Sequence, residues 1–137
     1  MLRPESRVRA RALQLLYAWE LQGRPPMGSV VVGLLAGAPL RRSALEHAEP
    51  LASAVAANVA RLDDEIAAAI EHWEPQRVGM IERTILRLAL HELWTDRAPP
   101  RVVISEAVRL AHWFAGAKAP AFVNGVLDAL ARRAGRL

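Results

Sequence analysis

The 137-residue sequence predicts an all-α protein with about six or seven helices in one domain, residues 1–137. Apolar residues recur at steps of three and four along nearly the whole chain, which is the spacing of a buried helix face. No stretch alternates apolar and polar residues between turn dipeptides, as a half-buried strand would. Prolines and glycines interrupt the periodic stretches, so short loops are expected between the helices.

Three helices are predicted in the first half of the chain. Gly23 and Pro25-Pro26 end the first helix, and an apolar segment from Val30 to Leu35 predicts the second. The third is predicted as one long helix, with Pro50 in its first turn and Pro75 after its end. The apolar stripe of the first helix comprises Val8, Ala12, Leu15, Leu16 and Trp19, and that of the long helix Leu51, Val55, Val59, Leu62, Ile66, Ile70 and Trp73.

The second half predicts a central helix and two that follow it. From Val78 to Trp94 apolar residues occupy two faces, which is typical of a helix buried on most sides. Pro99-Pro100 breaks the chain, a periodic stretch then runs from Val103 to Phe114, and Pro120 opens the last helix. Trp73, Trp94 and Phe114 are predicted to belong to the core.

Composition excludes several classes of function. The chain has no cysteine, so disulfides and thiolate metal sites are impossible, and a reducing, cytoplasmic location is expected. Its start does not resemble a signal peptide, and no run of about 18 uncharged apolar residues predicts a membrane span. The four histidines lack metal-site spacing and no glycine-rich phosphate loop is present, so neither a cofactor nor catalysis is expected. Asp63-Asp64 is interpreted as a solvated helix face.

The positive charge points to a polyanionic partner. The net charge is +4, and four arginines, Arg3, Arg7, Arg9 and Arg11, gather around the start of the first helix. At about 100° per residue, Arg7, Arg11 and Gln14 share a face opposite the apolar stripe, and Tyr17 flanks it. Guanidinium groups bind phosphates and tyrosine rings stack on unpaired bases, so this face is a candidate RNA-binding surface. The alternative is a solvated arginine face with Tyr17 half-buried.

A second arginine pair lies on the central helix. Arg83 and Arg87 are four residues apart and follow Glu82. They could contact phosphate, but a bridge to acidic residues elsewhere in the fold is the preferred interpretation.

Four stretches together resemble the NusB family of bacterial transcription antitermination factors. They read ALQLLYAWELQG (12–23), IERTILRLALHEL (81–93), VVISEAVRLAHWF (102–114) and FVNGVLD (122–128). The resemblance implies two small helical bundles, no catalysis, and binding of single-stranded boxA RNA in nascent ribosomal RNA transcripts. It implies as partners a NusE-like small-subunit ribosomal protein, other Nus factors and RNA polymerase.

The same resemblance assigns roles to residues of this chain. It implies RNA contacts for Arg3, Arg7, Arg9, Gln14 and Tyr17, to which the helical face adds Arg11. Phe122 and Asn124 are expected at the other edge of the same surface, with Lys118 restoring charge where relatives often carry a lysine and this chain has Ala121. Glu82 lies where the family meets RNA or the NusE-like protein, and Arg83 is grouped with it as a partner contact.

The Asn124-Gly125 pair inside an apolar helical pattern needs a reason. Gly125 is expected to allow close approach of a helix or a nucleotide. Asn124 is expected to hold the loop before it through its side-chain amide or to contact RNA; the alternative is that it only caps or braces the helix start after Pro120. Ser105 and His91 replace the asparagine and tyrosine that are usual in the family, which bears on RNA preference rather than on the fold.

Two alternative functions remain open from the sequence. NusB-like domains also precede some ribosomal RNA cytosine methyltransferases, so the chain could be an RNA-holding domain. It could also be a helical scaffold that forms a homodimer through a surface that includes the arginine-rich segment.

Overall fold

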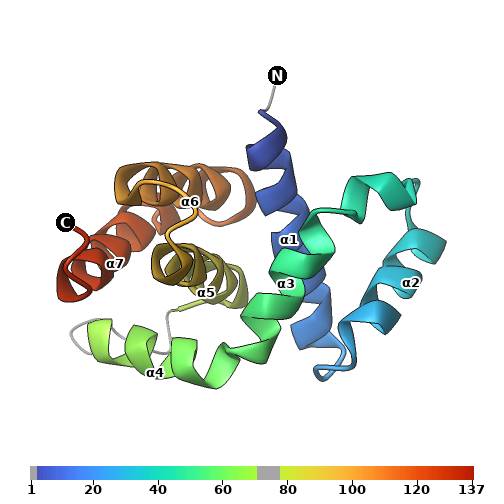
Figure 1. The fold of residues 1–137 in the computed structure, drawn as a ribbon, viewed down its shortest axis with the longest axis horizontal. Helices are drawn as coiled ribbons and strands as arrows, with labels where there is room; N and C mark the ends of the chain where they lie inside the picture. The colour runs from blue at the N-terminus through green and yellow to red at the C-terminus, as the bar shows by residue number, and fades with distance from the viewer. Residues whose placement is uncertain (1–2, 71–77) are drawn as a thin grey trace. The chain divides into compact units, whose positions relative to one another are not determined.

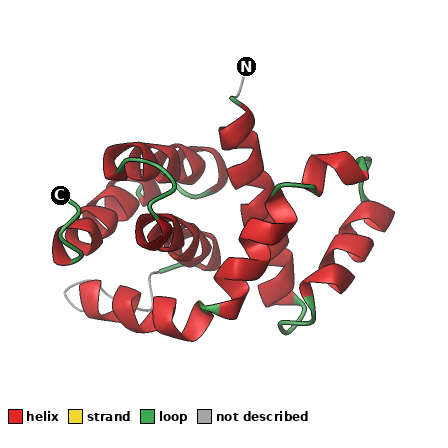
Figure 2. Cartoon of the chain, viewed as in Figure 1, coloured by secondary structure: helices red, strands yellow, loops and turns green. Residues whose placement is uncertain are grey.

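The computed structural model describes residues 3–70 and 78–137, and these residues form helices joined by loops (Figures 1 and 2). The predicted all-α class is confirmed. Trp73 and Pro75 lie outside the described residues. The elements are α1 (Pro4–Leu21), α2 (Met27–Gly37), the 3-10 helix η1 (Arg42–Leu45), α3 (Ala48–Ala57), α4 (Val59–Ala69), α5 (Met80–Thr95), α6 (Pro100–Phe114) and α7 (Ala119–Arg133).

The chain divides into two compact units, Met1–Ala57 and Asn58–Leu137. In the first unit α1 packs against α2, η1 and α3. The apolar stripe predicted for α1 is the face that it buries: Ala12, Leu15, Leu16 and Trp19 are all less than a tenth exposed, and Val8 is half-buried. Burial of such side chains stabilises the unit by roughly 1.5–3 kcal/mol for each large one.

The second unit is built around α5, which packs against α4, α6 and α7 (Figure 1). Every residue from Thr84 to Leu93 is buried. The prediction of a central helix covered on most sides is therefore confirmed, and it explains why apolar residues occupy more than one face of this segment. Alongside it, α6 and α7 lie against each other.

The predicted long helix is wrong, because the chain leaves helical geometry at Asn58. That residue has φ −113° and ψ 14°, and it separates α3 from α4. The apolar stripe runs across the break but serves two cores: Leu51 and Val55 are buried in the first unit, and Leu62 and Ile66 in the second. The spacing of apolar residues predicts which of them are buried, but it does not predict whether they belong to one continuous helix.

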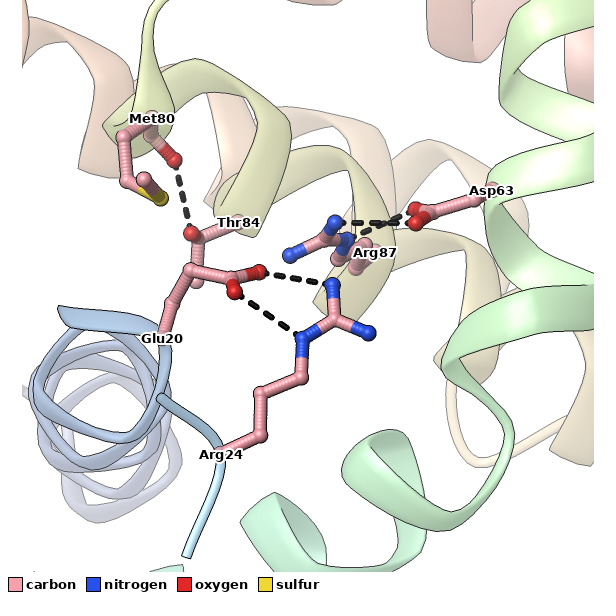
Figure 3. A network of polar contacts seen from close by, with 6 residues as sticks. All are labelled: Glu20, Arg24, Asp63, Met80, Thr84 and Arg87. Atoms are coloured by element: carbon pink, nitrogen blue, oxygen red, sulfur yellow. Dashed lines mark hydrogen bonds and ion pairs between the residues drawn. The ribbon is translucent and has the colours of Figure 1, made fainter. Parts of the chain in front are cut away.

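The end of α1 follows from a glycine and an ion pair. Gly23 adopts φ 84°, which is strain-free only for glycine, and the N–H of Arg24 bonds the carbonyl of Trp19 at 2.8 Å. Arg24 itself has φ 65°, an uncommon value for a residue with a Cβ. Its guanidinium donates to both carboxylate oxygens of Glu20, at 2.9 Å each (Figure 3). This bidentate contact helps to hold the turn that directs the chain into α2.

Candidate nucleic-acid interface

The amino end of α1 presents arginine to solvent. Pro4 occupies the first turn, where its missing N–H costs nothing, and Arg3 precedes it in an extended conformation. Arg3 and Arg7 are exposed, and Arg11 is half-buried. The helix therefore holds at least two guanidinium groups where a phosphate can reach them.

The shared face predicted for α1 is confirmed for Arg11 and Gln14. Nη1 of Arg11 donates a hydrogen bond to Oε1 of Gln14 at 3.0 Å, so the two side chains lie together on one face. A guanidinium carries five N–H donors, so this bond leaves others for a phosphate, and the Gln14 amide keeps its NH₂ as a donor. Tyr17 is half-buried one turn farther on. The face thus combines charge, amide and aromatic ring, as predicted.

Arg9 differs from the other arginines of this cluster. Its side chain is only 8% exposed, and it lies on the side of α1 that carries the core residues. Charged side chains this buried are held by contacts within the protein. The contact of Arg9 with RNA stays a prediction, whereas Arg3 and Arg7 are the accessible members of the cluster.

The predicted RNA contacts of the second unit lie around the start of α7. Lys118 precedes the helix and is exposed, Phe122 is half-buried, and Asn124 is exposed in the second turn. The capping role considered for Asn124 is wrong, because the residue at the cap position is Lys118 and Asn124 lies inside the helix. Gly125 is half-buried in the same helix, and its role in close approach stays a prediction.

Both predicted partner contacts stand at the start of α5. Oε2 of Glu82 accepts a hydrogen bond from the N–H of Gly79 at 2.9 Å, which satisfies a donor that the helix start would otherwise leave unpaired. A Cβ on residue 79 would lie 2.6 Å from that oxygen, so the Glu82 carboxylate would have to shift slightly if residue 79 were not glycine. Glu82 and Arg83 are half-buried, and their contact with a partner stays a prediction.

Arg87 is a structural residue, as preferred from the sequence. Its side chain is 5% exposed, and it donates to both carboxylate oxygens of Asp63 on α4, at 2.7 and 2.9 Å (Figure 3). The interpretation of Asp63-Asp64 as a solvated face is therefore wrong for Asp63 and fits only Asp64, which is exposed. A pair separated by 24 residues has no local pattern from which to predict it.

A groove of about 460 Å³ lies between α6 and α7. Sequence reasoning missed most of its polar residues, although the spacing of Asp128 and Arg132 indicates the ion pair that they form at 2.9 Å. Asn124 and Ser105 are the two lining residues that the sequence had singled out. The lining comprises Arg101, Ile104, Ser105, Val108, Asn124, Asp128, Arg132 and Leu137.

The carboxyl end of α6 contradicts one prediction about the core. Phe114 is 48% exposed and is not a core residue, and the neighbouring Trp113 is 42% exposed. Trp94 is half-buried, with the Arg61 guanidinium 4.1 Å from the centre of its ring. Helical spacing placed Phe114 in the buried stripe of this segment, but about half of its side chain stays accessible to solvent.

His91 of α5 is a described residue whose pKa is clearly shifted. Burial lowers the pKa of His91 below its usual value of 6.5, the nearby Glu92 carboxylate opposes this, and Arg97 reinforces it. Among the described residues His91 Nδ1 has no hydrogen-bond partner. A buried neutral imidazole on α5 fits a core role rather than proton transfer.

Residues 3–70 and 78–137 contain no cluster of three or more His, Asp or Glu side chains suited to a metal ion. None of the described helices is both long and apolar enough to cross a bilayer.

Comparison with known proteins gives one consistent family. The model of the NusB family matches residues 6–132. The transcription antitermination protein NusB of a Nitratiruptor species is 37% identical over 124 residues, which are 90% of this chain and 88% of that protein. The solution structure of NusB from Aquifex aeolicus is 30% identical, with a TM-score of 0.79 over 96% of this chain and 89% of that one. A chain from a crystal structure of a plectonemic RNA supercoil is also 30% identical, with a TM-score of 0.77 over 97% of each chain.

Proposed function

The chain belongs to the NusB family, and on that premise we propose that it binds single-stranded boxA RNA in nascent ribosomal RNA transcripts. Its relatives are transcription antitermination proteins, a non-enzymatic family. We further propose that it acts in the cytoplasm with a NusE-like small-subunit ribosomal protein, which Glu82 and Arg83 contact. Together they join other Nus factors on RNA polymerase.

The observation that best supports RNA binding is the polar face of α1. The exposed Arg7, the bonded pair Arg11 and Gln14, and the half-buried Tyr17 lie on this helix, and the exposed Arg3 directly precedes it. Single-stranded RNA is bound by cations that track its phosphates and by aromatic rings that stack on its bases. Lys118, Phe122 and Asn124 of the second unit offer the same combination of charge, ring and amide, and we propose them as further contacts.

The length of the relatives supports antitermination over the methyltransferase-associated alternative. The chain matches 88% of the Nitratiruptor protein, which is named for antitermination alone. A methyltransferase would carry a large catalytic domain beside the matched region. Self-association stays an alternative that the experiment below must also address, because a dimer formed through α1 would compete with RNA.

The test measures affinity for RNA as a function of salt. Fluorescence anisotropy of a labelled boxA RNA is followed with the protein alone and with the NusE-like protein, against a scrambled RNA. Tighter binding to boxA that strengthens with the partner is expected. Equal and weak binding to both RNAs, with a dimer seen by light scattering, would instead favour the self-associating scaffold.

Substitutions at Arg7 locate the interface. Arg7→Ala should weaken binding and make the salt slope less negative by roughly 0.7, the value for one phosphate on a single strand. Arg7→Lys keeps the charge and loses the bidentate fork, so its slope should stay near that of the wild type while affinity falls. Arg41→Ala removes an exposed arginine of the same unit outside α1 and is the matched control. An unchanged slope in Arg7→Ala would remove this residue from the interface.

A further inference from the structure

The carboxyl end of α6 exposes two adjacent aromatic rings. Trp113 and Phe114 are 42% and 48% exposed, and their rings meet edge to face with centroids 6.4 Å apart and planes at 86°. Among the large apolar side chains exposed in the described residues, these two are the aromatic ones. Exposed apolar side chains that lie together, rather than singly, indicate a binding surface.

The Trp113 ring is held in place by its own helix. The guanidinium of Arg109, one turn earlier, lies 5.9 Å from the centre of the indole. Nη1 of Arg109 is in turn 3.9 Å from Oε2 of Glu106, whose side chain is only 10% exposed. The carboxylate therefore attracts the cation, and the cation lies over one face of the ring. Contacts of this kind favour one rotamer of the indole, and a ring with fewer rotamers loses less conformational entropy when a ligand binds it.

The chain segment that carries these rings has charged side chains of one sign. Residues 109–122 contain no aspartate or glutamate, and they include Arg109 and Lys118. Lys118 is exposed, as is His112 in the last turn of α6. The nearby carboxylate of Glu106 is paired with Arg109. Aromatic rings edged by cations complement a ligand with flat apolar faces and negative charge, and single-stranded nucleic acid has both.

We propose that Trp113 and Phe114 form a stacking platform for an unpaired base of single-stranded RNA, with Arg109 and Lys118 facing its phosphates. This proposal rests on the RNA-binding function proposed above and extends it to Arg109, Trp113 and Phe114, for which the sequence predicted no RNA contact. The spacing of Arg109 and Trp113 was the local signal, since residues four apart share a helix face. A protein partner would also bury the rings, but the uniform positive charge favours RNA.

The experiment compares three variants of the full chain. Trp113→Phe keeps an aromatic ring, Trp113→Leu keeps an apolar side chain without one, and Val102→Ala trims another exposed apolar residue of α6 as the control. Each is titrated with the labelled boxA RNA and, separately, with the NusE-like protein without RNA. Tryptophan fluorescence is recorded during the RNA titration, and far-UV circular dichroism checks the fold, which should not depend on a half-exposed indole.

Stacking predicts that Trp113→Leu weakens RNA binding about 5- to 150-fold. Trp113→Phe should retain most of the affinity, Val102→Ala should match the wild type, and the salt slope should not change. RNA should quench indole emission of the wild type more strongly than that of Trp113→Phe.

Three outcomes would overturn the proposal, and they are distinguishable. If the wild type binds RNA and Trp113→Leu binds it equally well, the stacking platform is refuted, whereas the proposed RNA-binding function still holds. A loss of affinity only for the ribosomal protein assigns the rings to a protein contact. If the wild type binds neither boxA nor scrambled RNA, the proposed function itself fails and the platform fails with it.

Discussion

Removing the carboxylate of Asp63 should destabilise the second unit, because it leaves the buried Arg87 guanidinium without its bidentate acceptor. The Arg87 side chain is 5% exposed, and its hydrogen bonds to Asp63 measure 2.7 and 2.9 Å. Taking one partner from a buried ion pair costs about 3–5 kcal/mol. Asp63 is itself 31% exposed, so water can replace part of the lost interaction. Alanine also favours the helix by about 0.5 kcal/mol. We therefore expect Asp63→Ala to lower the free energy of unfolding by about 2 kcal/mol.

The assay is urea unfolding followed by far-UV circular dichroism, with Asp64→Ala as the matched control. Asp64 is the exposed neighbour on the same helix, so its removal should change the free energy of unfolding by less than about 0.5 kcal/mol. Asp63→Asn keeps an acceptor oxygen and should fall between the wild type and Asp63→Ala. In the double variant with Arg87→Met, much of the loss should be recovered, because no buried charge is left unpaired.

Two results would refute this reasoning. If Asp63→Ala and Asp64→Ala are equally mild, the ion pair adds nothing to stability and Arg87 is solvated by other means. If the two single losses simply add in the double variant, Asp63 and Arg87 are not coupled.

Three further predictions concern Tyr17, Glu82 and His91. Tyr17→Ala should weaken boxA binding by roughly 1–3 kcal/mol if a base stacks on the ring. Tyr17→Phe should bind nearly normally in the same anisotropy assay. If Tyr17→Phe instead loses all of its affinity for boxA, the hydroxyl makes the contact. Glu82→Ala removes the acceptor for the Gly79 N–H, so it should lower the free energy of unfolding by about 0.5–2 kcal/mol even without any partner. If the free energy of unfolding is unchanged and the ribosomal protein binds more weakly, Glu82 is a partner contact alone. Because burial lowers the pKa of His91 in the folded state, the unfolded chain binds the proton first. Stability supplied by neutral His91 is therefore complete above pH 6.5 and lost as the pH falls below it, by at most about 1.4 kcal/mol per pH unit. His91→Leu should flatten that part of the stability–pH curve, and a variant curve parallel to the wild type would show that His91 does not contribute to it.

Most helices were predictable from the sequence because they depend on residues that are close together in the chain, namely regularly spaced apolar residues and flanking prolines. The stripe of α1, the all-round burial of α5 and the proline starts of α6 and α7 each follow from residues within a few turns of one another. The polar face of α1 is local for the same reason, since residues three and four apart meet on one helix. The bond between Arg11 and Gln14 is a direct consequence.

Tertiary structure alone decided which apolar residues are covered and which distant charges meet. The stripe from Leu51 to Ile66 looks continuous, yet the chain turns at Asn58 and divides it between two cores. Phe114 has core spacing, yet packing leaves it 48% exposed beside Trp113. The pairing of Arg87 with Asp63 depends on how α4 packs against α5. Periodicity describes one helix at a time, whereas burial and ion pairing depend on the neighbour that packing brings to it.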